Sequence, residues 1–567
     1  MIAQRLGDVE SGVPRFDRGE ETRHMRKNEC FEMRCEGFGQ DAQGVCRHEG
    51  MAVFVPGLLP GERALVRIVK TEKRYAFGRV EKLLEESGER AEPFCPIYRR
   101  CGGCSCQHMT YAASLEFKRM QVRDLLQRVG GVEIDVPPVL GMAQPFAYRN
   151  KGTYPVGLKD GEPVCGFFAP RSHDLIPLPE MGCRIQGEDS HAATRAVLRW
   201  MRETGAQPYD EQTGRGLVRH VMTRRASGGG LMAVLVATRG QIPQPGALVR
   251  ALREAVPRLE SAILCVNPRR TNVILSGDMR PLWGADTMED TLCGLRFSVS
   301  PLSFFQVNPE QTQRLYQLAL DFAELTGEET VVDAYCGAGT ISLLLAQKAR
   351  RVVGIEIVPQ AIDNAKQNAA RNGVTNAEFL VGATEEVLPR LVANGLRPDV
   401  VVVDPPRKGC EEAVLTAIAQ AAPRRVVYVS CGAPTLARDV KRLSESGYRA
   451  ERVQCVDMFC WTGAVETVVQ LSKGEIQSKK IKVDLSLEEL DTSGFKKGAT
   501  YEEIKRYVLE HTGLKVSCLY IAQVKQKCGI IERECYNKPK SENARQPQCP
   551  PEKEAAIRAA LEHFRMI

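Results

Sequence analysis

Short runs of alternating apolar and polar residues open the patterned part of the sequence. They follow a polar, aperiodic stretch over residues 1–24, which we predict to be a disordered tail. Residues 51–55, 63–69 and 75–80 alternate with a period of two, with turn signals between them. This pattern is typical of strands that bury one face. We therefore predict a small OB-like β-barrel over residues 25–88.

The pattern then changes to mixed helix and strand. Apolar residues at helical spacing predict a helix over residues 111–129, and continuous apolar runs follow at 216–222 and 230–237. These features predict a central α+β domain over residues 89–295.

From residue 296 to residue 472 the rhythm is strand then helix, repeated. Each strand is a short Val-rich or Ile-rich run, and the four clearest are 330–333, 351–356, 399–404 and 425–430. This alternation predicts an α/β, Rossmann-like domain with a parallel sheet and helices on both faces. Ligands of such sheets bind at the carboxyl ends of the strands.

The remaining residues, 473–567, are rich in Lys and Glu. Residues 499–510, 520–527 and 551–564 have helical spacing, so we predict a small helical C-terminal extension. The sequence assigns it no role, and an RNA-binding module is a hypothesis.

Composition and charge narrow the class of protein. The 567 residues are 43% hydrophobic, and no apolar run is long enough to span a membrane. The amino terminus does not resemble a signal peptide, and the net charge of +7 permits a nucleic-acid partner without requiring one. We expect a multidomain, cytoplasmic monomer with no membrane partner. Five basic residues of the barrel form either a solvated face or an RNA contact: Arg67, Lys70, Lys73, Arg74 and Arg79.

A glycine loop follows the first α/β strand. Residues 333–340 read Asp-Ala-Tyr-Cys-Gly-Ala-Gly-Thr, and Glu356 ends the next strand, where a carboxylate can accept the ribose hydroxyls of an adenosine. The loop lacks the third glycine of a dinucleotide-binding loop. The pattern therefore favours S-adenosylmethionine, a nucleoside cofactor without phosphates, and Asp404-Pro-Pro on a later strand supports this interpretation.

A cysteine stands at the end of another strand. Cys431 is followed by a glycine on the rim where substrates bind. Most cysteines in such sheets are small core residues, but a strand end gives this thiol the access that a nucleophile needs. Glu466 is the candidate carboxylate partner, and without that pairing it would be interpreted as an exposed edge residue.

Twenty cysteines without an export signal indicate metal or thiol chemistry rather than disulfides. Cys95, Cys101 and Cys104 form a tight group, and Cys183 supplies a distant fourth thiol. Their spacing suits zinc and an iron–sulfur cluster about equally. Cys106 is a further thiol two residues after Cys104, and four cysteines near the carboxyl end stay unassigned: Cys518, Cys528, Cys535 and Cys549.

Five motifs, in order, resemble the RNA (uracil-5-)-methyltransferase family. They are Phe304-Phe-Gln306-Val-Asn308, the glycine loop, Asp404-Pro-Pro-Arg-Lys-Gly409, Val429-Ser-Cys431 and Val465-Glu466-Thr467. Tyr-Arg-Asn-Lys at residues 148–151 also matches. The barrel resembles a TRAM domain, and the four-cysteine pattern resembles the bacterial 23S rRNA branch that carries an iron–sulfur cluster.

The resemblance implies methyl transfer from S-adenosylmethionine to C5 of a uridine in 23S ribosomal RNA. It implies that Cys431 adds to uracil C6 and that Glu466 removes the C5 proton. It further implies a [4Fe-4S] cluster on Cys95, Cys101, Cys104 and Cys183, and it assigns four residues to the cofactor: Gln306, Tyr335, Glu356 and Asp404.

The sequence departs from the family pattern beside both catalytic residues. The nucleophile is usually followed by Asn-Pro or Asp-Pro, and here it is followed by Gly432, Ala433 and then proline. Trp461 and Ala464 replace two histidines that usually precede the base. We predict activity, because Cys431 and Glu466 are present. The alternative is a non-catalytic or weakly active RNA-binding paralogue. A radical methylthiotransferase is disfavoured, because its Cys-x3-Cys-x2-Cys signature is missing.

Overall fold

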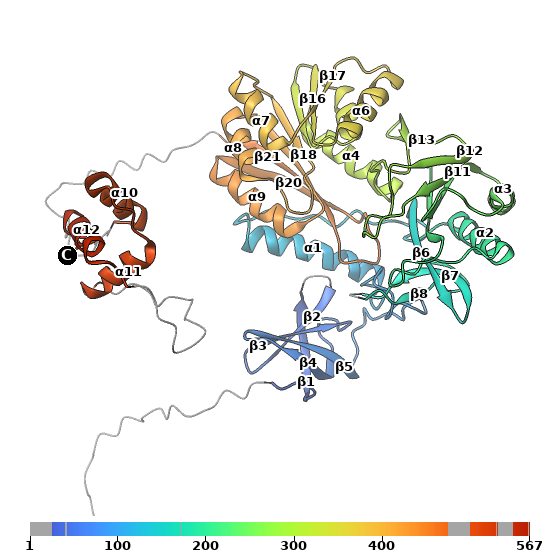
Figure 1. Cartoon of the computed structure of the whole chain (residues 1–567), viewed down its shortest axis with the longest axis horizontal. Coiled ribbons are helices and arrows are strands. Elements are labelled where there is room, and N and C mark those ends of the chain that lie inside the picture. The colour runs from blue at the N-terminus through green and yellow to red at the C-terminus, as the bar shows by residue number, and fades with distance from the viewer. Residues whose placement is uncertain are drawn as a thin grey trace, which may run out of the picture. The chain divides into compact units, whose positions relative to one another are not determined.

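The computed structural model describes residues 25–39, 42–170, 172–474, 499–528, 530, 548–564 and 566–567. Contacts divide the chain into two units, residues 1–477 and residues 478–567, and Figure 1 shows both. Among the helices of the described residues, none has the length and apolar character needed to cross a membrane. The predicted disordered tail lies outside the described residues.

The first unit begins with a closed five-stranded barrel in the order β1-β2-β3-β5-β4. The strands are β1 (Cys30–Phe38), β2 (Gln43–His48), β3 (Met51–Pro56), β4 (Arg63–Thr71) and β5 (Tyr75–Glu85). Alternate residues point inwards, and Val66 and Ile68 of β4 are fully buried. The predicted barrel is confirmed. Its basic face is partly neutralised, because Arg67 and Arg79 both contact Glu81.

A long helix and a seven-stranded sheet follow the barrel. They comprise α1 (Tyr111–Arg128), β6 (Lys151–Lys159), β7 (Glu162–Phe168), β8 (Leu175–Pro177), α2 (Glu188–Thr204), β9 (Val218–Arg225), β10 (Leu231–Ala237), α3 (Pro245–Ala255), β11 (Leu259–Val266) and β12 (Met279–Gly284). The sheet order is β12-β11-β10-β9-β6-β7-β8. Helices α2 and α3 cover one face around the buried Trp200. Met232 and Val234, on the other face of β10, share a core with the α/β part of the chain.

The α/β part is a second seven-stranded sheet, in the order β17-β16-β15-β18-β19-β21-β20. A hairpin and a helix precede it: β13 (Met288–Leu292), β14 (Leu295–Val299) and α4 (Pro309–Ala323). Its parallel strands are β15 (Thr330–Ala334), β16 (Arg351–Glu356), β17 (Ala377–Val381), β18 (Val400–Val403) and β19 (Arg425–Ser430). Two strands run antiparallel to their neighbours, β20 (Tyr448–Val456) and β21 (Glu466–Lys473).

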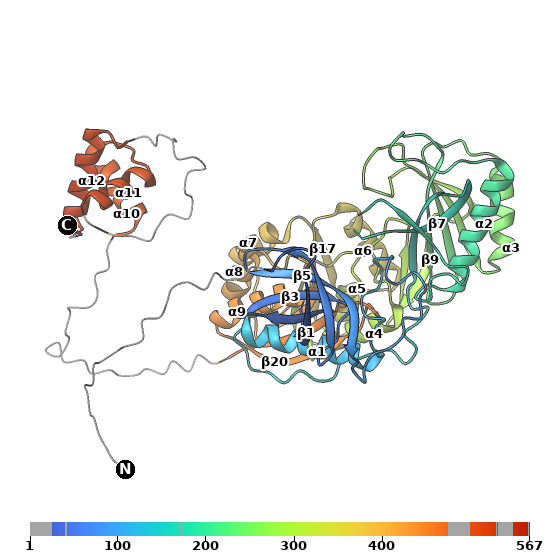
Figure 2. The same cartoon turned by 90° about the horizontal axis from the view of Figure 1, so that it is seen from below.

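Helices cover both faces of this sheet, as Figures 1 and 2 show. Residues of α4, α5 (Thr340–Ala346) and α6 (Pro359–Arg371) pack on one face. Residues of α7 (Thr384–Ala393), α8 (Glu412–Ala421) and α9 (Ala433–Glu445) pack on the other, together with α1. Because its strands bury side chains on both faces, each strand reads as a continuous apolar run. The predicted Rossmann-like fold is confirmed.

The described residues of the second unit form three helices, α10 (Tyr501–Thr512), α11 (Cys518–Lys527) and α12 (Pro551–His563). The side chain of Thr500 and that of Glu503 cap α10 reciprocally. Buried residues of all three helices form one small core that includes Ile504, Ile521 and Ile557. The three helices occur where their spacing predicts them, and their role stays open.

Candidate active site

Four of the predicted site residues lie at one edge of the α/β sheet. Tyr335 follows β15, Glu356 ends β16, Asp404 follows β18 and Cys431 follows β19. These strands are parallel, so their carboxyl ends meet at the same edge. The topology therefore gathers residues that are almost one hundred positions apart in the sequence.

Glu466 reaches the same edge from the opposite direction. It begins β21, and the pairing of Ser430 with Thr467 places Cys431 beside Glu466 in the antiparallel register. Glu466 is only 2% exposed, whereas Cys431 is half-buried. Because β21 lies between β19 and β20, the interpretation of Glu466 as an exposed edge residue is wrong.

The acidic groups at this edge are held with altered pKa values. Burial raises the pKa of Glu466 to about 8, and the charge of Asp404 adds to this shift. Burial and the neighbouring Asp333 raise the pKa of Asp404 to about 7. Burial and the same two carboxyls, Glu466 and Asp404, raise the pKa of the Cys431 thiol to about 11, and Arg407 opposes that shift. Close acidic groups of this kind favour a positively charged ligand.

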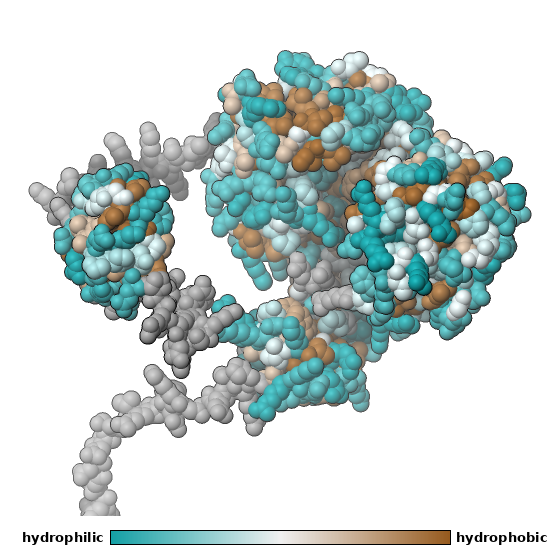
Figure 3. Space-filling model, in the orientation of Figure 1, coloured by the Kyte–Doolittle hydropathy of each residue, from teal (hydrophilic) through white to brown (hydrophobic). Residues whose placement is uncertain are grey.

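The glycine loop presents its backbone to Glu356. The Gly337 N–H donates to Glu356 Oε2 at 3.2 Å, and the Val358 N–H donates to Oε1 at 2.9 Å. Tyr335 has a φ of 108°, a left-handed conformation that non-glycine residues seldom adopt. Strain of this kind is typical of a functional loop. Apolar residues, among them the exposed Ile357, follow Glu356, and Figure 3 shows apolar side chains gathered on this part of the molecule.

Gln306 lies in the segment that joins the β13–β14 hairpin to α4. Its backbone oxygen accepts from Asn150 Nδ2 at 3.0 Å, and the Asn150 N–H donates to the Val307 oxygen at 2.8 Å. The side chain of Asn308 then caps α4. The motif at residues 148–151 therefore fixes the backbone of the motif that contains Gln306.

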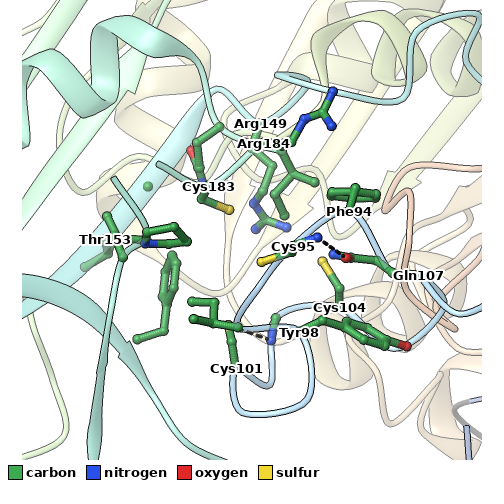
Figure 4. Close-up of a pocket in the computed structure, with 18 of the residues that line it drawn as sticks. Phe94, Cys95, Tyr98, Cys101, Cys104, Gln107, Arg149, Thr153, Cys183 and Arg184 are labelled. Atoms are coloured by element: carbon green, nitrogen blue, oxygen red, sulfur yellow. Dashed lines mark hydrogen bonds between the residues drawn. The ribbon is translucent and has the colours of Figure 1, made fainter. Parts of the chain in front are cut away.

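The four predicted metal-ligating cysteines line one cavity of about 460 Å³. Figure 4 shows Cys95, Cys104 and Cys183 around it, with Cys101 below. Cys106 does not line this cavity and is fully buried in a separate apolar cluster. Among the described residues, no three His, Cys, Asp or Glu side chains are close enough to hold a single metal ion.

Comparison with known proteins identifies the family. A family model described as tRNA (Uracil-5-)-methyltransferase matches residues 293–474, and a TRAM domain model matches residues 28–80. An uncharacterized RNA methyltransferase of Halalkalibacterium halodurans is 47% identical over 449 residues, which cover 79% of this chain and 98% of that protein. The chain belongs to the RNA (uracil-5-)-methyltransferase family.

Other members of the family agree with this assignment. An uncharacterized RNA methyltransferase of Listeria innocua is 46% identical over 79% of this chain and 98% of that protein. The crystal structure of the Pyrococcus abyssi tRNA (uracil-54, C5)-methyltransferase in complex with S-adenosyl-L-homocysteine is similar, with a TM-score of 0.63 and 27% identity. That likeness covers 78% of this chain and 99% of the archaeal one. The chain is an S-adenosylmethionine-dependent RNA methyltransferase with a TRAM domain, and the predicted enzyme class is confirmed.

The structure adds two residues that sequence analysis assigns no role. Arg407 acts electrostatically on both Cys431 and Glu466. Asp439 is fully buried, and it accepts from the Tyr428 hydroxyl at 2.7 Å and from the Cys410 N–H at 2.8 Å. It thus ties the loop after β18 to β19, the strand that precedes Cys431. The sequence could have indicated a role for Asp439, because it is an acidic residue on the otherwise apolar face of α9.

We expect Glu466→Gln to stabilise the protein at alkaline pH. The pKa of Glu466 is near 8 when folded and ordinarily 4.5. Between these values the unfolded carboxyl loses its proton and the buried one keeps it, so the stability of the wild type falls as the pH rises. The neutral amide avoids this loss of folding stability. The loss amounts to a few kcal/mol, because each unit of pKa shift corresponds to roughly 1.4 kcal/mol. Unfolding temperatures from pH 4 to pH 9 measure the difference.

The exposed Glu445, replaced by glutamine, serves as the control for this prediction. Its unfolding temperature should follow that of the wild type at every pH. A Glu466→Gln variant with the same pH dependence as the wild type would show that Glu466 has an ordinary pKa.

Proposed function

We propose that this enzyme methylates C5 of a uridine in 23S ribosomal RNA, through a covalent bond between Cys431 Sγ and uracil C6. The observation that carries the proposal is the register of β19 and β21, in which a thiol adjoins a buried carboxyl. Uracil C5 is a poor nucleophile until C6 carries an adduct, and a soft thiolate suits such an addition.

The two residues divide the reaction between them. The Cys431 thiol loses its proton to solvent and its thiolate forms the S–C6 bond, so that the electron pair of the C5–C6 double bond makes C5 nucleophilic. S-Adenosylmethionine, when bound, supplies the methyl group. The Glu466 carboxylate then takes the C5 proton, the double bond re-forms, and the S–C6 bond breaks to return the thiolate. Burial beside Asp404 gives Glu466 a pKa near 8, which suits a general base.

We assign Gln306, Tyr335, Glu356 and Asp404 to the cofactor. Glu356 ends a strand beside the glycine loop, where its oxygens can accept ribose hydroxyls. Asp404 brings negative charge towards the reacting thiol, which favours the sulfonium of the cofactor.

The proposed reaction on a uridine and the TRAM domain both support an RNA substrate. A uridine has to leave its stack to reach Cys431, at a cost of a few kcal/mol that is smallest in a single-stranded loop. Exposed Lys73 and Arg74 of the barrel are suited to phosphate contacts. We propose that the enzyme acts in the cytoplasm as a monomer.

The 23S rRNA assignment is tested by mapping 5-methyluridine in ribosomal RNA from cells with and without the gene. We expect at least one 23S position to lose the modification, and restoring the wild-type gene should return it. An unchanged 23S map with a lost methyl group in another RNA would redirect the substrate assignment.

We also propose a [4Fe-4S] cluster in the cysteine cavity. Arg149, Lys151 and Arg184 line this cavity with the four thiols, and no acidic side chain is among its lining residues. Such a surface fits a cluster whose four thiolates leave it negatively charged. Zinc bound by the same four thiolates is the alternative, and the metal content distinguishes the two. The cluster's role is structural, because methyl transfer needs no redox step.

We expect Cys104→Ser and Cys183→Ser to lose iron when the protein is purified without oxygen. The wild type should contain roughly four iron and four sulfide ions per chain. Cys106→Ala is a matched control, because Cys106 lies in the same loop but not in the cavity. Metal analysis measures both. Stoichiometric zinc in the wild type, with no sulfide, would contradict the proposal.

A further inference from the structure

Residues 457–465 form a closed loop that ends at the proposed base. Val456 pairs with Glu466 across β20 and β21, so the loop leaves and rejoins the sheet at one point. It contains Trp461 and Ala464, the two departures from the family pattern that precede the base. The path of this loop therefore sets the direction in which Glu466 enters the site.

Helix α1 holds the first half of the loop. Asp457 and Lys118 form an ion pair, and both side chains are fully buried. The Tyr111 hydroxyl donates to the other oxygen of Asp457 at 2.6 Å, and Lys118 also donates to the Phe459 oxygen at 3.1 Å. Removing one partner of such a buried pair is strongly destabilising, because it leaves an uncompensated buried charge, so this contact anchors the loop to α1.

The loop that carries Cys95, Cys101 and Cys104 holds the second half of the 457–465 loop. The backbone N–H groups of Ser105 and Cys106 donate to the Trp461 oxygen at 2.9 and 3.0 Å. In return, the Gly463 N–H donates to Ser105 Oγ at 3.0 Å. Three hydrogen bonds thus join the segment that carries Cys104 to the residues just before Glu466.

The Trp461 side chain stabilises the contact between these two loops. Its Nε1–H donates to the Pro145 oxygen at 2.8 Å, and its ring packs against those of Phe94, Tyr111 and Phe146. Trp461 is 8% exposed and has a φ of 66°, a conformation that the surrounding contacts have to maintain.

We propose that Ser105 and Trp461 are positioning residues for Glu466, and that they control the removal of the C5 proton rather than the formation of the adduct. The proposal rests on the proposed roles of Cys431 and Glu466. Among the described residues, no hydrogen bond joins Ser105 or Trp461 to Cys431. Cys431 follows β19, where the Ser430 hydroxyl and the Gly432 backbone form hydrogen bonds with each other. Loosening the loop should therefore misplace the base and leave the nucleophile unaffected.

The test separates the two steps in single-turnover reactions with RNA that carries tritium at uridine C5. Covalent protein–RNA complex on denaturing gels reports adduct formation, and tritium release reports proton removal. We expect Trp461→Phe and Ser105→Ala each to slow tritium release by about fivefold, the effect of one lost hydrogen bond. Adduct formation should stay within about twofold of the wild type, so the complex accumulates. Ser105→Thr, which retains a hydroxyl, should restore release.

Trp200→Phe is a matched control, because the Trp200 indole also donates to a proline oxygen, that of Pro243, in the central domain. It should leave both steps unchanged. Equal slowing of both steps in the Trp461→Phe variant, or no slowing of either, would overturn the positioning role. A wild-type protein that forms no adduct and releases no tritium would overturn the proposed function itself.

Discussion

The Cys431→Ala variant is expected to lose methyl transfer by about 10⁴-fold or more, which is the scale of removing a catalytic nucleophile. Without the S–C6 bond, uracil C5 stays too weak a nucleophile to accept a methyl group. Fold and cofactor binding should be retained, because Cys431 is half-buried after the end of β19 and alanine fits there without a clash. Transfer of labelled methyl groups from S-adenosylmethionine to a uridine-containing RNA measures the loss.

Cys518→Ala is the control for this variant, since Cys518 is exposed in the second unit. It should methylate RNA at the wild-type rate. Substantial methylation by Cys431→Ala would mean that the reaction proceeds without a thiol adduct.

The Glu466→Gln variant is expected to behave differently, because it should stop after methyl transfer. The amide cannot take the C5 proton, so the S–C6 bond cannot break and the methylated RNA stays attached to Cys431. Turnover should fall by about 10²- to 10⁴-fold, the range for loss of a general base. Mass spectrometry of the denatured complex should find protein, RNA and one added methyl group.

Glu445→Gln, on the exposed surface of α9, controls for the charge change. It should turn over normally and leave no covalent complex. Normal release of product by Glu466→Gln would assign proton removal to another group, and Asp404 would be the next candidate because it is also buried at this edge.

The order of strands and helices could be predicted from the sequence because each pattern is local. Strands β15, β16, β18 and β19 are buried on both faces and are therefore continuous apolar runs, which place Glu356, Asp404 and Cys431 at strand ends. A residue can be placed at the end of a buried strand from the local sequence alone, without knowledge of the rest of the fold.

The surroundings of Glu466 could not be predicted in this way. Its burial results from β21 lying between β19 and β20, a pairing between distant segments. The contacts of Trp461 with Ser105 likewise join residues about 350 positions apart, and no local pattern indicates them. The basic barrel face shows the same limit, since Arg67 of β4 pairs with Glu81 of the neighbouring strand β5.

The most direct test of the account uses RNA that contains 5-fluorouridine. Fluorine at C5 cannot leave as a proton does, so the enzyme should stall after methyl transfer with Cys431 still bonded to C6. We predict a complex that survives denaturation, needs S-adenosylmethionine, carries one added methyl group and has its RNA attached at Cys431. Absence of this complex from an active wild-type preparation, or its undiminished formation by Cys431→Ala, would contradict the account.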